Sequence, residues 1–300
     1  MTPPTLPSGV ARQSARLMRR MVFNQGLPWE AQRTRLTRVG GSAKPPAGLE
    51  LSTDTIAGVP VEVLTPSVAE PVGTLVHFHG GGFTVGTPAL GRSWAGAIAL
   101  RLGLEVVLPD YRLAPEHTFP AAHDDAVAVV ADVLGRYAPA SVAVSGDSAG
   151  GNLALSVAQH QVATGGPIPG SLVLLSPWLD LTVDRLVDLA LVRRDPLLSP
   201  EWLAAAATAY AAGELADPRV SPLLGSLDGL PPVLIQGGTD DILAPDAARL
   251  AAGLGDGATL SIGPGMWHDF SLQVGMLAAA DRALEVVVGH LSDSLDLAEA

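Results

Sequence analysis

The chain has no cysteine, which excludes disulfide bonds, thiol catalysis and thiolate metal sites. Basic residues are also scarce, because 18 Lys and Arg face 30 Asp and Glu and give a formal net charge of −12. A chain this acidic is a poor candidate for binding nucleic acid or anionic membranes. No apolar run is long enough to span a bilayer, and the N-terminus lacks an apolar core of signal-peptide length. We therefore expect a cytoplasmic protein that binds no nucleic acid and has no integral membrane association.

The positive charge that is present is concentrated at the N-terminus. Residues 1–40 hold seven arginines and a single acid, Glu30, so this segment has a net charge of +6. The favoured interpretation is a basic helical segment that docks on the acidic body. The alternative is an interfacial segment that touches lipid or substrate aggregates.

Short apolar runs alternate with helix-like segments along most of the chain. This alternation predicts an α/β fold with a mainly parallel central sheet and helices on both faces. The composition, 48% hydrophobic and 16% charged in 300 residues, is sufficient for one large core. The runs expected as strands are 49–55, 59–64, 74–78, 104–108, 141–144, 171–175, 233–235 and 259–262.

The alternation stops between about residues 181 and 222, where no strand-like run occurs. A helix is expected here, with Ser199 as N-cap, Pro200 at its first position and Gly213 at its end. We predict an N-terminal helical cap segment at 1–45 and a catalytic domain at 46–300, with a helical cap insertion at about 181–222. Together the two helical regions are expected to cover the carboxyl edge of the sheet.

A nucleophile motif follows the strand-like run at 141–144. The sequence Gly146-Asp147-Ser148-Ala149-Gly150 lies between that run and a helical segment, the context in which G-x-S-x-G forms a sharp strand–turn–helix. Small residues around the serine permit the turn. Ser148 is therefore the candidate nucleophile, and the Ala149 amide lies where a helix N-terminus favours negative charge.

A glycine-rich loop follows the run at 74–78. The sequence His79-Gly80-Gly81-Gly82-Phe83 is typical of an oxyanion loop, because glycines let backbone N–H groups face a substrate oxygen. We assign the oxyanion donors to Gly81, Gly82 and Ala149. His77 and His79 are interpreted as structural residues that hold the loop.

The general base and the acid must follow Ser148 in the order Ser, acid, His. His268 lies just beyond the run at 259–262, in a loop that can reach over the sheet edge, and is the candidate base. Asp241 follows the run at 233–235 and is the preferred acid, with Asp240 and Asp180 as alternatives.

These motifs resemble the bacterial hormone-sensitive-lipase-like family of carboxylesterases, in its GDSAG branch. The resemblance implies an α/β-hydrolase fold with a helical cap, hydrolysis of short- to medium-chain acyl esters through an acyl-enzyme intermediate, and neither metal nor cofactor. Some relatives open lactones or remove acetyl groups. The matching blocks are HGGG at 79–82, DYRLAPE at 110–116, GDSAGGN at 146–152, SPWLD at 176–180 and MWHDF at 266–270.

The remaining predictions concern the DYRLAPE loop, His123, the partners, the alternative functions and the substrate pocket. DYRLAPE is interpreted as a structural loop that braces the site, and His123, which departs from the family's apolar residue, as a surface change. The expected partner is a small-molecule ester, with a homodimer left open. An amidase or deacetylase using the same residues, and a non-catalytic ligand receptor, are the alternative functions. Candidate pocket residues, each equally consistent with core packing, are Phe83, Trp178, Met266 and Trp267.

Overall fold

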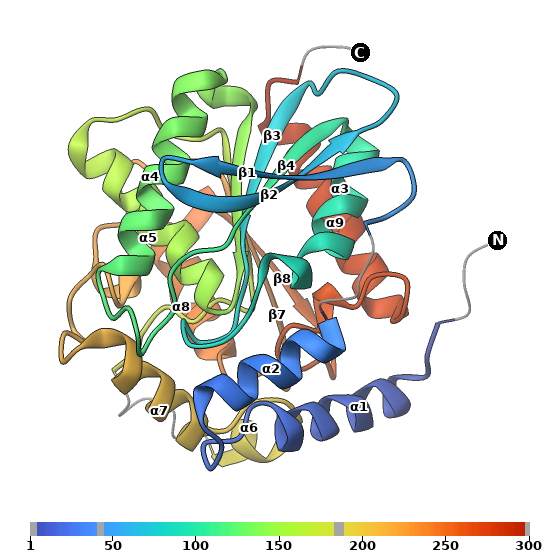
Figure 1. Ribbon diagram of the computed structural model, residues 1–300, viewed down its shortest axis with the longest axis vertical. Helices are drawn as coiled ribbons and strands as arrows, with labels where there is room; N and C mark the ends of the chain where they lie inside the picture. Colours follow the sequence, from blue (N-terminus) through green and yellow to red (C-terminus); the bar gives the residue numbers. More distant parts are fainter. Residues whose placement is uncertain (1–4, 41–44, 183–188, 298–300) are drawn as a thin grey trace.

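The computed structural model describes residues 5–40, 45–182 and 189–297. Eight strands form one sheet in the order β1-β2-β4-β3-β5-β6-β7-β8 (Figure 1). β2 pairs antiparallel with both β1 and β4, and all other neighbours are parallel, so the predicted mainly parallel sheet is confirmed. The strands are β1 Leu49–Ile56, β2 Val59–Pro66, β3 Gly73–Phe78, β4 Leu104–Pro109, β5 Val142–Asp147, β6 Ser171–Leu175, β7 Val233–Gly238 and β8 Ala258–Gly263.

Helices cover both faces of this sheet because successive strand residues point to opposite sides. In β3, for example, Leu75 belongs to a core with Trp94 and Leu284, whereas Val76 belongs to a core with Val129 and Leu153. α3 (Arg92–Leu102) and α9 (Ala278–Ser294) supply the first core, and α4 (Ala121–Arg136), α5 (Ala149–Thr164) and α8 (Ala244–Leu254) supply the second. None of the described helices is long and apolar enough to cross a bilayer.

The remaining helices gather at one end of the molecule. α1 (Ser8–Met21) and α2 (Trp29–Gly40) lie there with α6 (Leu189–Arg194) and α7 (Pro200–Ala211), at the bottom of Figure 1. α7 begins as expected, because the Ser199 hydroxyl accepts from the Trp202 amide at 3.3 Å. We refer to these four helices as the cap. The division at residue 45 stays a prediction, and residues 1–4, 41–44 and 183–188 of the predicted cap segments lie outside the described residues.

Trp202 is the centre of the cap. Its ring meets Phe23 edge-on at 5.1 Å between centroids, and its indole N–H donates to Gln32 Oε1 at 2.9 Å, which joins α7 to α2. The same ring reaches the glycine loop after β3, since a Cβ on Gly82 would lie 2.7 Å from Trp202 Cη2. The cap therefore covers the carboxyl end of β3.

One expectation about the surface is wrong. His123 is buried, with 3% of its surface exposed, and packs beside Phe119 and His160. The reason is its position on α4, where His123 shares the inward face with Ala122 and Ala126. The adjacent Asp124 is on the exposed side.

Candidate active site

Ser148 occupies a tight turn between β5 and α5. Its backbone has φ 54° and ψ −116°, a conformation that non-glycine residues rarely adopt. The turn requires glycine nearby, because a Cβ on Gly150 would lie 1.9 Å from the carbonyl oxygen of Phe78. The Ser148 amide donates to the Leu175 carbonyl at 2.9 Å, and only 5% of the residue is exposed. Ser148 is thus held at the carboxyl edge of the sheet.

The glycine loop lies directly beside this serine. A Cβ on Gly80 would lie 3.1 Å from Ser148 Cβ, and the Gly80 amide donates to Asp147 Oδ2 at 2.9 Å. Among the described residues, the amides of Gly81, Gly82 and Ala149 have no hydrogen-bond acceptor. Three N–H groups predicted as oxyanion donors are therefore available to a ligand.

His77, His79 and Tyr111 hold the glycine loop in place. His79 Nδ1 lies 2.7 Å from the Gly80 carbonyl, and Tyr111 donates to the His79 carbonyl at 2.6 Å while its ring stacks on the imidazole. His77 Nδ1 is 3.0 Å from Ser145 Oγ, and its Nε2 is 3.3 Å from Asp147 Oδ1. These contacts agree with a structural interpretation of both histidines and of the loop that contains Tyr111.

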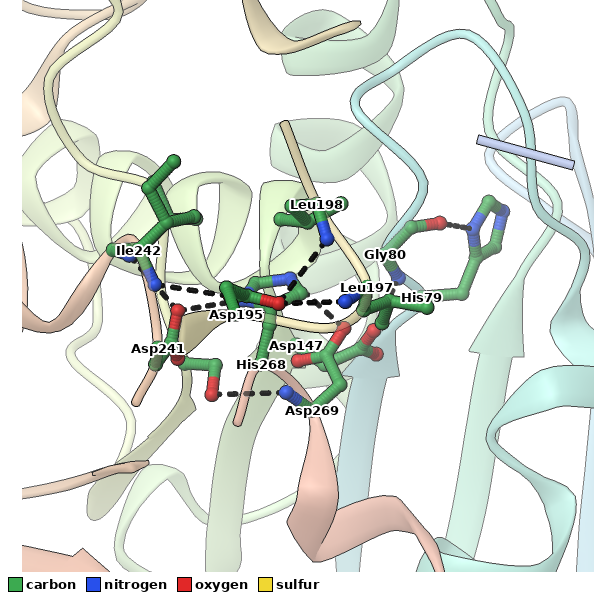
Figure 2. Close-up of polar contacts among 12 residues, drawn as sticks. His79, Gly80, Asp147, Asp195, Leu197, Leu198, Asp241, Ile242, His268 and Asp269 are labelled. Carbon is green, nitrogen blue, oxygen red and sulfur yellow. Dashed lines mark hydrogen bonds and ion pairs between the residues drawn. The ribbon is translucent and has the colours of Figure 1, made fainter. Parts of the chain in front are cut away.

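His268 and Asp241 come together from the loops after β8 and β7. His268 Nδ1 lies 3.1 Å from Asp241 Oδ1, and both side chains are buried (Figure 2). The two alternative acids have other partners within the described residues. Asp240 pairs with Arg12, and Asp180 pairs with Arg249. Asp241 is therefore the one of the three candidates in contact with the imidazole.

A second carboxylate contacts the other side of the same imidazole. His268 Nε2 is 3.1 Å from Asp269 Oδ2, and the Asp269 amide is fixed by Ser176 Oγ at 3.1 Å. Burial lowers the pKa of His268, but the charges of Asp269 and Asp241 outweigh it and place this pKa well above its usual value. Burial raises the pKa of Asp269 to about 7, against the opposing effect of His268.

Sequence reasoning missed the position of Asp269. In the sequence, Asp269 could be recognised only as an ionisable residue next to the candidate base, within Met266–Phe270. The direction of its side chain depends on the turn of the chain at residue 269, where φ is 55°, and the sequence does not show that turn.

Asp195, from the cap, is a further residue that sequence reasoning missed. Its Oδ2 accepts from the Ile242 amide at 3.0 Å, and its Oδ1 accepts from Leu197 at 2.7 Å (Figure 2). Burial and the charge of Asp241 raise the pKa of Asp195 to about 6. This side chain ties the cap to the loop that presents Asp241. Asp195 precedes Pro196, a turn signal, but the sequence alone does not name the turn's distant partner.

The four predicted pocket residues fall into two separate groups. Phe83 stacks on Tyr210 of α7 with centroids 3.8 Å apart, and Trp178 lies 6.2 Å from Phe83. Met266 and Trp267 instead pack with Ala11 and Ala15 beneath α1. The structure therefore brings Phe83 and Trp178 together beside the glycine loop and places the other pair under the N-terminal helix.

A metal-binding cluster is not found in the parts of the chain that the structure describes, where no three His, Asp or Glu side chains converge suitably. The chemistry available to the site is that of a serine hydroxyl, an imidazole between two carboxylates, and free backbone amides.

Known proteins share this sequence and architecture. A family profile described as alpha/beta hydrolase fold matches residues 75–272. LipR from Mycobacterium tuberculosis is 34% identical over 96% of each chain, and an acetyl-hydrolase from Streptomyces hygroscopicus is 37% identical over 73% of this chain and 75% of its own. The crystal structure of a hormone-sensitive lipase from a metagenome library superposes with a TM-score of 0.90 at 29% identity, covering 97% of this chain and 99% of that one. The chain therefore belongs to the α/β-hydrolase fold family and, as its motifs predicted, to the ester hydrolases of the hormone-sensitive-lipase group.

Proposed function

We propose that the protein hydrolyses esters of short- to medium-chain acids, with Ser148 as nucleophile, His268 as general base and Asp241 as the acid that orients the imidazole. The observation that carries the proposal is the contact of His268 Nδ1 with Asp241, since it leaves Nε2 as the nitrogen that accepts a proton. The strained turn at Ser148 and the free amides of Gly82 and Ala149 support the same chemistry.

The proposed reaction has two halves. His268 Nε2 takes the Ser148 proton as Oγ attacks the ester carbonyl, and the amides of Gly81, Gly82 and Ala149 stabilise the oxyanion. The imidazolium then protonates the leaving alcohol, and an acyl-enzyme remains. Water, deprotonated by His268, attacks the acyl carbon and releases the acid and the free serine.

The contact between Nε2 and Asp269 adds one requirement. Nε2 cannot accept the serine proton while it donates to Asp269 Oδ2, so that side chain must release the imidazole before attack. The raised pKa of His268 points to the same requirement. A carboxylate on each side stabilises the charged imidazolium, and the charged form cannot accept the serine proton.

The acyl group is proposed to lie beside Phe83 and Trp178. Phe83 directly follows the glycine loop, and Tyr210 from the cap packs on its ring and closes that side. A closed aromatic wall favours short acyl chains, and the name of the Streptomyces relative, an acetyl-hydrolase, points to the same size. Met266 and Trp267 remain pocket candidates only through their place beside His268.

The test is turnover of p-nitrophenyl butyrate by the wild type and by Ser148→Ala. We expect a loss of about 1000-fold or more, because removing a triad nucleophile costs several powers of ten. Ser226→Ala, at an exposed loop, is the matched control and should retain full activity. The assignment is wrong if the Ser148 variant keeps more than about a tenth of the wild-type rate.

Two further substrate comparisons define the specificity. A chain-length series of p-nitrophenyl esters locates the acyl limit, which we expect at short to medium length. The matched anilide tests the amidase alternative, and hydrolysis of the anilide at the ester's rate would reject an ester specificity.

A further inference from the structure

α1 presents apolar side chains on the face turned away from the protein. Val10, Leu17 and Met21 are 50%, 57% and 41% exposed, and their spacing of seven and four residues aligns them along one side of the helix. Leu6, which precedes the helix, is 38% exposed, and its amide donates to the carbonyl of Met276, a residue 53% exposed. The opposite face, with Ala11 and Ala15, is buried. We call Val10, Leu17 and Met21 the apolar row of α1.

Unpaired arginines lie beside this row. A cavity of about 260 Å³ between α1 and α6 is lined by Arg16, Arg19, Arg20 and Arg193, together with Asp195 and Pro196. None of the four guanidinium groups forms an ion pair with any residue that the structure describes. Asp195 does not neutralise them directly, because its carboxylate accepts from the backbone amides of Leu197 and Ile242.

Two other arginines of the N-terminal segment, Arg12 and Arg33, bind residues of the α/β body. Arg12 donates to Asp240 and to the Gly265 carbonyl, and Arg33 pairs with Glu116. These two dock the segment on the acidic body, as the sequence suggested. Of the arginines of the cavity, Arg16, Arg20 and Arg193 are exposed and available to an external anion, whereas Arg19 is half-buried and donates to the Asp195 carbonyl at 3.4 Å.

We propose that the apolar row of α1 and the neighbouring arginine cavity dock the protein on an anionic lipid–water interface. Guanidinium groups bind the phosphates of the headgroups, and the row inserts Val10, Leu17 and Met21 at the level of the upper acyl chains. The charge of the molecule orients it, because residues 1–40 carry +6 whereas the whole chain carries −12. The acidic remainder is repelled by the surface that attracts α1.

A second copy of the chain fits this face less well. A symmetric pair would bring the same positively charged patch of both copies together. Like charges in contact oppose such a pair, whereas an anionic surface neutralises them.

Docking at this face would bring the site close to aggregated esters, a consequence that rests on the proposed function. Arg12, on the inner side of α1, lies over the Trp267 ring at 5.2 Å, and Trp267 precedes His268. One helix therefore separates the lipid-facing row from the loop of the proposed base.

The experiment is flotation of the Ser148→Ala protein with vesicles of phosphatidylcholine alone or with added phosphatidylglycerol. The serine variant is used so that the lipid esters are not hydrolysed. We expect binding to the anionic vesicles only, with a partition coefficient that falls about tenfold or more in Arg16→Gln/Arg20→Gln and in Leu17→Gln/Met21→Gln. The controls are Arg282→Gln and Val286→Gln, both exposed on α9, and should bind as the parent does.

Three results would overturn the proposal: no binding to anionic vesicles, equal loss in the α9 controls, or a dimer in solution that Leu17→Gln/Met21→Gln converts to monomer. The first two deny a specific lipid contact, and the third shows a second copy on the face. Matching thermal midpoints of the variants establish that they are folded. Hydrolysis is measured separately on soluble p-nitrophenyl butyrate, so wild-type turnover without vesicle binding rejects only the docking proposal. Vesicle binding without wild-type turnover rejects only the proposed function.

Discussion

The loops that surround Ser148 and the cap that covers them are fixed by different kinds of contact. The glycine loop is held by buried bonds within the α/β body, such as Gly80 N–H to Asp147 and Tyr111 O–H to the His79 carbonyl. The cap is joined to that body both by partly exposed ion pairs, such as Arg12 with Asp240, and by buried contacts, such as the Asp195 carboxylate with the Ile242 amide and the Tyr210 ring with Phe83. Partly exposed ion pairs contribute little to stability. We therefore expect the cap to loosen first where ion pairs alone hold it, while the glycine loop stays in place.

The largest expected effect separates two adjacent residues of the loop after β7, one that contacts His268 and one that holds the cap. Asp241→Asn replaces the carboxylate with an amide that can donate to Nδ1 and so fix the wrong tautomer of His268, and kcat should fall about 1000- to 10,000-fold. Asp240→Asn weakens only its ion pairs with Arg12 and Arg194, both in the cap, and should lower kcat by a few-fold at most. Steady-state kinetics with p-nitrophenyl butyrate measure kcat of both variants. Similar losses in both variants would contradict the distinction between site and cap.

The next effect concerns the bond that holds the oxyanion loop. Asp147→Ala leaves the buried Gly80 N–H without an acceptor, which should cost about 1–3 kcal/mol in the free energy of unfolding. We expect kcat to fall about 10- to 100-fold, less than the loss of an oxyanion donor itself. Asp147→Asn keeps an acceptor oxygen and should retain more of both properties. Denaturant unfolding and kinetics measure the two effects, and an Asp147→Ala protein with normal values of both would refute this role.

A smaller effect should be confined to the cap. Gln32→Ala removes the acceptor of the buried Trp202 indole N–H, so α7 should open more often, at a cost of about 1–3 kcal/mol. Hydrogen exchange should speed up in α7 and stay unchanged in α5, with Gln25→Ala, at an exposed position, as the control. If exchange in α5 accelerates equally, cap and body open as one unit and the comparison above is wrong.

The parts of the site that could be predicted from sequence depend on local sterics. A turn as tight as that at Ser148 needs glycine at 150, and this requirement is visible in five consecutive residues. The strands and helices could be predicted from the alternation of apolar runs, because that pattern is also visible in short stretches of the sequence. The sequence favoured Asp241 over Asp240 and Asp180, and its contact with His268 Nδ1 is the spatial observation that supports this preference.

The contacts that were missed join segments far apart in the sequence. Arg12 and Asp240 are separated by 228 positions, and Asp195 and Ile242 by 47. His123 was misplaced because its departure from the family's apolar residue was interpreted as a surface change, whereas the packing of α4 decides which residues of the turn face inward. Long-range packing of this kind has no signature in a single chain.

The smallest expected effect is a change in pH dependence from the second carboxylate at His268. The imidazole must be neutral to accept the serine proton, and Asp269 stabilises its charged form, so activity should rise with pH as His268 loses its proton. Asp269→Asn removes that charge and lowers the pKa of His268. The midpoint of the kcat/KM profile should therefore move to lower pH, and the variant should be the more active enzyme on the acidic side. Asp256→Asn, at an exposed position, should leave the midpoint in place. An unchanged midpoint in the Asp269 variant would mean that its carboxylate leaves the imidazole before the titration that limits catalysis.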